Sequence, residues 1–215
     1  MNGKINNFFL VIDDFLNEEI VEELYRSLLQ KDFESFFVFK KDLNNSHEVV
    51  SQRTSINDII RKTWIDNLPF LSEGVVGFEV WSNFMQGNST LGLHIDCDEQ
   101  YHATTGNYRT PIYTSVLYLG PENHLTGGEL ALGLNEHFNV SNASATTRWK
   151  DFEQVRKDDN NWVKISYKRN RLVVFDPFYP HQVLPIEEGT EKSPRVGLTM
   201  AAWDREIKIT EEKKY

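Results

Sequence analysis

The chain has 215 residues, enough for one well-cored domain, and its 32 acidic residues outnumber its 23 basic residues to give a net charge of −9. No run rich in Lys or Arg occurs, which argues against an electrostatic nucleic-acid surface. A single cysteine, Cys97, excludes a disulfide within the chain and fits a reducing cytoplasm. The first apolar run, Phe8 to Ile12, is too short for a signal peptide or a membrane span. We therefore expect a cytoplasmic protein that binds neither nucleic acid nor membrane.

The first third of the chain predicts a short strand followed by two helices. The strand is the apolar run at 8–12, and a helix over 17–30 follows it. Asn17 is placed as the N-cap of this helix, and apolar residues then recur at helical spacing. A second helix is expected over 56–68, because Pro69 would stop it there. Residues 31–53 show no clear pattern.

From residue 75 onward the pattern changes to short strands separated by turn residues. The expected strands lie at 76–84, 91–96, 112–119, 129–132, 162–167, 171–175, 181–184 and 196–203. The pair on either side of Lys168-Arg169-Asn170 is expected to form a hairpin. Many short strands with non-local pairing are typical of a jelly roll, or double-stranded β-helix.

We therefore predict a mainly β (α+β) fold, with a cupin-like double-stranded β-helix core and supporting N-terminal helices. One domain is expected over 1–215, in which 1–74 supports a core formed by 75–215. An insertion near 133–161 stands apart, because it is polar and rich in Asn, Ser and Thr. It is either a surface insertion or a lid over the functional site, and the sequence leaves both open.

The triplet His94-Ile95-Asp96 is the first candidate for chemistry. In an extended strand, side chains two residues apart point to the same face, so His94 and Asp96 would lie side by side. A buried unpaired aspartate is costly, and a bound metal would account for it. With His181 from another strand, the pair would complete a two-histidine, one-carboxylate site, which suits non-haem Fe(II). The alternatives are that His94 and Asp96 form an exposed pair without function, and that His181 is a turn histidine whose ring hydrogen-bonds to the backbone.

Arg195 begins an apolar strand fourteen residues after His181. An arginine whose head turns inward at such a position needs an anionic partner, and a guanidinium holds a carboxylate through two parallel hydrogen bonds. The alternative is a surface arginine that pairs with Glu187, Glu188 or Glu191. The two histidines upstream favour the inward interpretation.

Together these motifs resemble a known family. They occur in the order His94-x-Asp96, Tyr118-Leu119-Gly120, Gly127-Gly128-Glu129-Leu130, His181-x-Val183-x-Pro185, Arg195 and Trp203. This order resembles the Fe(II)/2-oxoglutarate-dependent dioxygenases, and within them the prolyl 4-hydroxylase-like branch. The match covers about the last two-thirds of the chain, from near Phe78 onward.

The resemblance implies a role for each of six residues. Iron would be bound by His94, Asp96 and His181. The distal carboxylate of 2-oxoglutarate would be bound by Arg195, assisted by Tyr118 and with Thr199 nearby. The implied cofactors are Fe(II) and 2-oxoglutarate, with ascorbate in a supporting role.

The chain departs from the branch at two places. The stretch between His181 and Arg195 is longer than usual, with residues 187–194 inserted, so Lys192 is the alternative partner for the cosubstrate carboxylate. The segment before His94 also lacks the tyrosine often found there, and has Trp81, Asn83 and Phe84 instead. The resemblance therefore implies no substrate or cosubstrate contact for the residues of this segment.

The expected activity is hydroxylation of an unactivated C–H bond, with release of succinate and CO₂. The branch favours a peptidyl or free amino acid as substrate, with proline as one candidate and O₂ as cosubstrate. Asp96 disfavours halogenation, because halogenating relatives have a small residue in its place. Alternatives are a natural-product tailoring oxygenase, a non-catalytic β-barrel that binds a metal or an anion, and a cupin-type enzyme without 2-oxoglutarate. The sequence does not predict an oligomeric state.

Overall fold

The computed structural model describes residues 9–30, 33, 35–43, 56–87, 89–120, 126–133, 162–186 and 194–209. Almost all of the expected insertion near 133–161 lies outside the described residues, and so does Lys192. Within the described part, no helix is long and apolar enough to cross a membrane.

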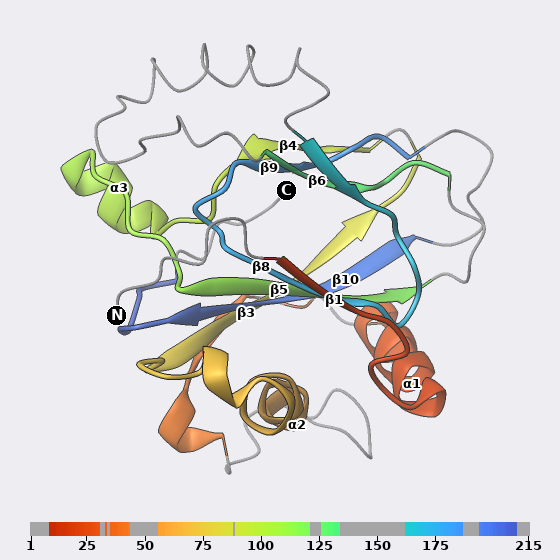
Figure 1. Cartoon of the computed structure of the whole chain (residues 1–215), viewed down its shortest axis with the longest axis horizontal. Helices are drawn as coiled ribbons and strands as arrows, with labels where there is room; N and C mark the ends of the chain where they lie inside the picture. Colours follow the sequence, from red (N-terminus) through yellow and green to blue (C-terminus); the bar gives the residue numbers. More distant parts are fainter. Residues whose placement is uncertain are drawn as a thin grey trace.

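Two antiparallel sheets face one another and form the body of the molecule (Figure 1). Their strands are β1 (Phe9–Ile12), β2 (Phe36–Phe39), β3 (Gly77–Met85), β4 (Leu91–His94), β5 (Tyr113–Gly120), β6 (Leu130–Gly133), β7 (Trp162–Ile165), β8 (Leu172–Phe175), β9 (His181–Val183) and β10 (Arg195–Trp203). The larger sheet has the order β1-β8-β5-β10-β3-β2 and the smaller one β4-β9-β6-β7. This arrangement confirms the predicted double-stranded β-helix core.

The helices lie mainly on one side of the larger sheet. They are α1 (Glu18–Gln30), η1 (Lys40–Asp42), α2 (Ile56–Ile60), η2 (Arg61–Asn67), η3 (Pro69–Leu71) and α3 (Glu99–Thr105). In Figure 1, α1 and α2 cover the face of the larger sheet that points away from the smaller one, as the expected N-terminal support requires. The helix predicted over 56–68 is α-helical only to Ile60 and continues as a π-helix to Asn67.

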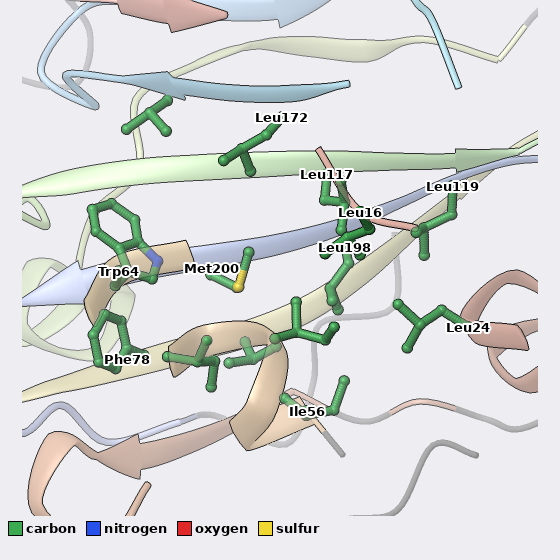
Figure 2. Close-up of a cluster of buried hydrophobic side chains, with 14 of the residues drawn as sticks. Leu16, Leu24, Ile56, Trp64, Phe78, Leu117, Leu119, Leu172, Leu198 and Met200 are labelled. Carbon is green, nitrogen blue, oxygen red and sulfur yellow. The ribbon is translucent and has the colours of Figure 1, made fainter. Parts of the chain in front are cut away.

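The main hydrophobic core fills the space between these helices and the larger sheet (Figure 2). Leu117 and Leu119 of β5 and Leu198 and Met200 of β10 point into it. Side chains alternate along a strand, so the residues between these face the smaller sheet instead. Tyr118, for example, packs with residues of β6 and β8 in a second cluster. The alternation thus sends one set of side chains to the core and the other to the space between the sheets.

Several expectations about the elements were wrong. Strands β7 and β8 do not form a hairpin, since β7 pairs with β6 whereas β8 pairs with β1 and β5. The connection between them crosses from one sheet to the other. A turn between two apolar strands has the same sequence pattern in a hairpin and in such a crossover, so the sequence did not distinguish them. Strand β2 and helix α3 were not anticipated. The strand expected over 91–96 ends at His94, so Asp96 lies just beyond it.

Candidate metal centre

Two histidines and an aspartate converge at the end of the smaller sheet. His94 ends β4 and His181 begins β9, and the two are paired in register with ring centroids 4.3 Å apart. One oxygen of Asp96, Oδ1, lies 3.7 Å from Nε2 of His94 and 3.5 Å from Nε2 of His181. The three ligand atoms lie within 4.8 Å of one another, which is compatible with one ion at bond lengths of about 2.0–2.2 Å.

The same local contact orients both imidazoles. Nδ1 of His94 lies 2.7 Å from the carbonyl of Gly92, and Nδ1 of His181 lies 3.0 Å from the carbonyl of Tyr179. Because a carbonyl oxygen only accepts, Nδ1 carries a proton in both rings, and Nε2 is the atom that each ring presents towards Asp96. A metal-binding histidine commonly has such a partner on its other nitrogen. The donor set therefore fits a divalent cation.

Asp96 is ionised, and a hydrogen bond to its second oxygen, the one that does not face the histidines, fixes its orientation. Its side chain is only 10% exposed, and its Oδ2 accepts a hydrogen bond of 2.6 Å from Oγ1 of Thr114. Burial acts to raise the pKa of Asp96, but the electrostatic and hydrogen-bond contacts with His181, the proximity of His94 and the hydrogen bond from the Thr114 hydroxyl outweigh it. The pKa of Asp96 is held well below its usual range, so the group is ionised at neutral pH. A buried ionised carboxylate is what a metal ligand requires.

Arg195 is a buried cation on the inner face of the larger sheet. Its side chain is 4% exposed, and within the described residues no carboxylate lies in ion-pair range of it. The guanidinium lies over the rings of Tyr118 and Tyr167, at 4.8 Å and 5.3 Å from their centroids. Its Nη1 contacts Sδ of Met85 at 3.3 Å. A buried charge without a counter-ion is costly, so this cation is suited to an anion that the described part of the chain does not provide.

Tyr118 and Thr199 lie on the same inner face as Arg195. Tyr118 is 1% exposed, and its Oη has no hydrogen-bond partner in the described part of the chain. Burial raises the pKa of Tyr118, and the charge of Arg195 offsets this only in part, so the phenol stays a neutral donor. Thr199 is 2% exposed and accepts a hydrogen bond from Asn83. A cation and an unpaired donor together fit the carboxylate of a small acid.

The structure thus brings the three expected iron ligands to one point and puts the three expected cosubstrate residues on one inner face. Three further residues of this region were missed by sequence reasoning, namely Thr114, Asn83 and Tyr167. Each contacts a partner that is distant in sequence, and no local pattern marks it. Arg195 is buried and is therefore not a surface arginine, whereas Glu187, Glu188 and Glu191, the partners considered for it, lie outside the described residues.

A two-histidine, one-carboxylate cluster in a double-stranded β-helix, with a buried cation on the inner face, defines the class of non-haem Fe(II) oxygenases. The family model described as the 2OG-Fe(II) oxygenase superfamily matches residues 80–203, which is more than half of the chain. The chain belongs to this superfamily. Fe(II) and 2-oxoglutarate are accordingly its cofactors, and it is a dioxygenase.

Solved structures share the fold at low sequence identity. A prolyl-4-hydroxylase from Pseudomonas putida is 20% identical, with a TM-score of 0.55 over 93% of this chain and 86% of that one. A prolyl hydroxylase from Trichoplax adhaerens, solved in complex with a hypoxia inducible factor oxygen degradation domain peptide fragment, is 17% identical, with a TM-score of 0.53 over 91% and 83%. A 2OG-Fe(II) oxygenase family oxidoreductase from Burkholderia pseudomallei is 10% identical, with a TM-score of 0.51 over 95% and 87%. No curated protein sequence matches the chain.

Proposed function

We propose that this dioxygenase hydroxylates an unactivated C–H bond of a peptidyl or free amino acid, with proline as the first candidate. The observation that carries the proposal is the convergence of His94, Asp96 and His181 within 4.8 Å, in a chain of the 2-oxoglutarate oxygenase superfamily. The amino-acid substrate is supported by the fold shared with two prolyl hydroxylases, one of them solved with a peptide fragment.

The three converging residues would hold Fe(II) through Nε2 of each histidine and a carboxylate oxygen of Asp96. Three protein ligands leave coordination positions open for the cosubstrate and O₂. The bound cofactors supply the oxidation: one oxygen atom of O₂ enters the substrate C–H bond, the other enters succinate, and CO₂ leaves. The chain's own contribution is to orient both imidazoles so that Nε2 faces the metal position, and to keep Asp96 ionised.

Arg195 binds the distal carboxylate of 2-oxoglutarate, with Tyr118 donating to it through Oη and Thr199 nearby. The charge of the buried guanidinium and the unpaired phenol are then both satisfied by one anion. Buried apolar side chains of β6 and β8, such as Leu132 and Val173, exclude water from this region. Arg195 and Tyr118 would thereby fix the cosubstrate at its far carboxylate, and its keto-acid end would remain available to the metal.

The direct test is to measure succinate release with Fe(II), 2-oxoglutarate, O₂ and ascorbate across free amino acids and proline-containing peptides. We expect one of these to raise succinate formation above the uncoupled rate, with a matching amount of product that has gained one oxygen by mass spectrometry. The matched control is the His181→Ala variant in the same assay, because it lacks one iron ligand.

If no amino acid or peptide is oxidised while a small natural product is, the substrate assignment is wrong and the tailoring oxygenase is correct. If succinate forms equally well in the His181→Ala variant, the iron-ligand assignment is wrong instead. Oxidation of a peptide but not of the corresponding free amino acid would identify the enzyme as a peptidyl hydroxylase.

A further inference from the structure

A row of three residues crosses the inner face of the larger sheet between Arg195 and Thr199. Gly197 of β10 is paired with Tyr118 of β5 on one side and with Asn83 of β3 on the other. All three face the smaller sheet, because the intervening residues of β10 point into the helix-covered core. Asn83 is therefore on the same face as the three residues assigned to 2-oxoglutarate.

The hydrogen bond between Asn83 and Thr199 has a defined direction. Nδ2 of Asn83 lies 3.1 Å from Oγ1 of Thr199, and an amide nitrogen can only donate. Thr199 is therefore the acceptor, and its own hydroxyl hydrogen remains to be donated elsewhere. Thr199 is 2% exposed, and the described residues provide no acceptor for this hydrogen. A buried donor without an acceptor is costly, so an acceptor from outside the described residues, such as a ligand, is expected.

Three hydrogen-bond donors around Gly197 lack a carboxylate acceptor among the described residues. The guanidinium of Arg195 has no carboxylate, the phenol of Tyr118 has no acceptor, and the hydroxyl of Thr199 has none either, within the part of the chain that is described. The Arg195 head lies over the ring of Tyr118, the residue paired with Gly197, so the cation reaches along the strand towards this row. One carboxylate group, which accepts several hydrogen bonds, can satisfy all three donors.

Gly197 leaves the centre of this row without a side chain. A Cβ atom on Gly197 would lie 3.3 Å from Cγ1 of Val116 and 3.9 Å from Cδ1 of Tyr118. With hydrogen alone at this position, no side chain of β10 stands between Arg195 and Thr199. Glycine at this position therefore lets the Val116 and Tyr118 side chains pack close to the β10 backbone beside the row.

We propose that Asn83 is a positioning residue of the 2-oxoglutarate site, which fixes the Thr199 hydroxyl so that it donates to the distal carboxylate beside Arg195. The inference rests on the proposed assignment of Arg195, Tyr118 and Thr199 to the cosubstrate. It places an amide of β3 in the segment where the related branch often has a tyrosine. Asn83 acts through Thr199 and not by direct contact with the reacting atoms.

A purely structural role for the Asn83 contact is the competing explanation. Strands β3 and β10 are already paired along nine consecutive residues, from Arg195 opposite Met85 to Trp203 opposite Gly77. One extra side-chain hydrogen bond is not needed to hold this ladder together. The two explanations differ in what they predict for ligand binding when either partner of the bond is removed.

The test is a double-mutant cycle on 2-oxoglutarate binding, measured by anaerobic titration calorimetry of the Fe(II)-loaded protein. Asn83→Ala is expected to raise the Kd by about 3- to 10-fold, the effect of one neutral hydrogen bond. Thr199→Ala is expected to have an effect at least as large. Because Asn83 acts through Thr199, the double variant should bind no more weakly than Thr199→Ala alone.

Two further variants distinguish an effect on 2-oxoglutarate binding from a general loss of folded protein. Asn83→Asp would accept the Thr199 hydroxyl hydrogen and add a negative charge, so it should weaken 2-oxoglutarate binding more than Asn83→Ala does. Ser82→Ala, next to Asn83 but on the opposite face of β3, is the matched control and should leave the Kd unchanged. Circular dichroism on each variant checks that the fold is retained.

The results separate this inference from the proposed function. If the wild type binds 2-oxoglutarate but Asn83→Ala binds it equally well, or if the two single effects add in the double variant, Asn83 has no positioning role. If Arg195→Gln also leaves the Kd unchanged, the assignment of this face to the cosubstrate is wrong, and the inference falls with it.

Discussion

At the scale of single residues, the candidate metal centre depends on hydrogen bonds that fix protonation. Each histidine donates from Nδ1 to a carbonyl two residues earlier, so the chain conformation just before each ligand sets its tautomer. Asp96 lies outside the regular strand and has no such local partner. Its orientation comes from Thr114, eighteen residues away on β5 of the other sheet. The hydroxyl of Thr114 therefore links the larger sheet to the metal site.

Replacing Thr114 by the nearly isosteric valine should weaken metal binding. Thr114→Val removes the donor to Oδ2 of Asp96 while it preserves the shape of a 1%-exposed side chain. Loss of such an outer partner typically costs 10- to 100-fold in metal affinity, and we expect a change of about that size for Fe(II). Competition with a chelator of known affinity measures it. Ser115→Ala, which removes a buried hydroxyl that donates to Met200 instead, is the control and should not alter metal affinity.

Arg195 is expected to benefit function at the expense of stability. Arg195→Met replaces a buried cation, which has no carboxylate partner among the described residues, by an apolar side chain of similar length, next to Met85 and two tyrosines. Without 2-oxoglutarate, the free energy of unfolding should stay unchanged or rise by up to about 4 kcal/mol. The Kd for 2-oxoglutarate should rise by about 10- to 150-fold, because charge-assisted hydrogen bonds are lost. Urea unfolding and calorimetry measure the two effects. A variant that loses stability and keeps affinity would show that Arg195 is structural.

At the scale of elements, the connection between β7 and β8 joins the two sheets and also anchors α1. Arg169, 7% exposed, is paired with Glu18 and Glu22 of α1. Asn170 has a φ of +60° and forms two hydrogen bonds with the backbone of Leu16, just before the helix. The same turn is hydrogen-bonded to the backbone of Tyr118. The helical layer is thereby fixed to the strand that carries one of the proposed cosubstrate residues.

Asn170 contributes both its backbone conformation and its side chain, and two substitutions separate these effects. Asn170→Ala should lower the free energy of unfolding by about 2–4 kcal/mol, since it loses two buried hydrogen bonds and strains a positive φ. Asn170→Gly relieves the strain but still loses the hydrogen bonds, so it should cost about 1 kcal/mol less. Chemical denaturation of both variants measures the difference. Equal losses for alanine and glycine would mean that backbone conformation does not matter at this turn.

At the scale of the whole molecule, the sequence predicted the layers and the chemistry better than the contacts. Strand periodicity and motif order were enough to anticipate the double-stranded β-helix, because side-chain alternation is a local property. Which strands are neighbours is non-local, and the expected hairpin at residues 168–170 proved to be a crossover. Thr114 and Asn83 were missed for the same reason, since their partners, Asp96 and Thr199, lie 18 and 116 residues away. Helix α3 escaped notice because it has seven polar-rich residues and no apolar face.

Ligand binding should stabilise the whole fold in two separable steps, because the proposed ligands come from both sheets. A metal ion would link β4 and β9 to the Thr114-bound Asp96, and 2-oxoglutarate would then compensate the buried charge of Arg195. At 100 times its Kd, each ligand adds about 2.7 kcal/mol, which for a chain of this size raises Tm by about 5–10 °C. Thermal unfolding with Mn(II) in place of Fe(II), alone and with 2-oxoglutarate, measures both steps.

The variants distinguish the two steps of stabilisation. His181→Ala should lose the increase caused by Mn(II) and, because the cosubstrate's keto-acid end then has no metal to chelate, most of the increase caused by 2-oxoglutarate. Arg195→Gln should keep the full metal step and lose most of the second one. A metal step that survives in His181→Ala would place the ion elsewhere in the chain. A second step that survives in Arg195→Gln would mean that another cation, such as Lys192, binds the distal carboxylate.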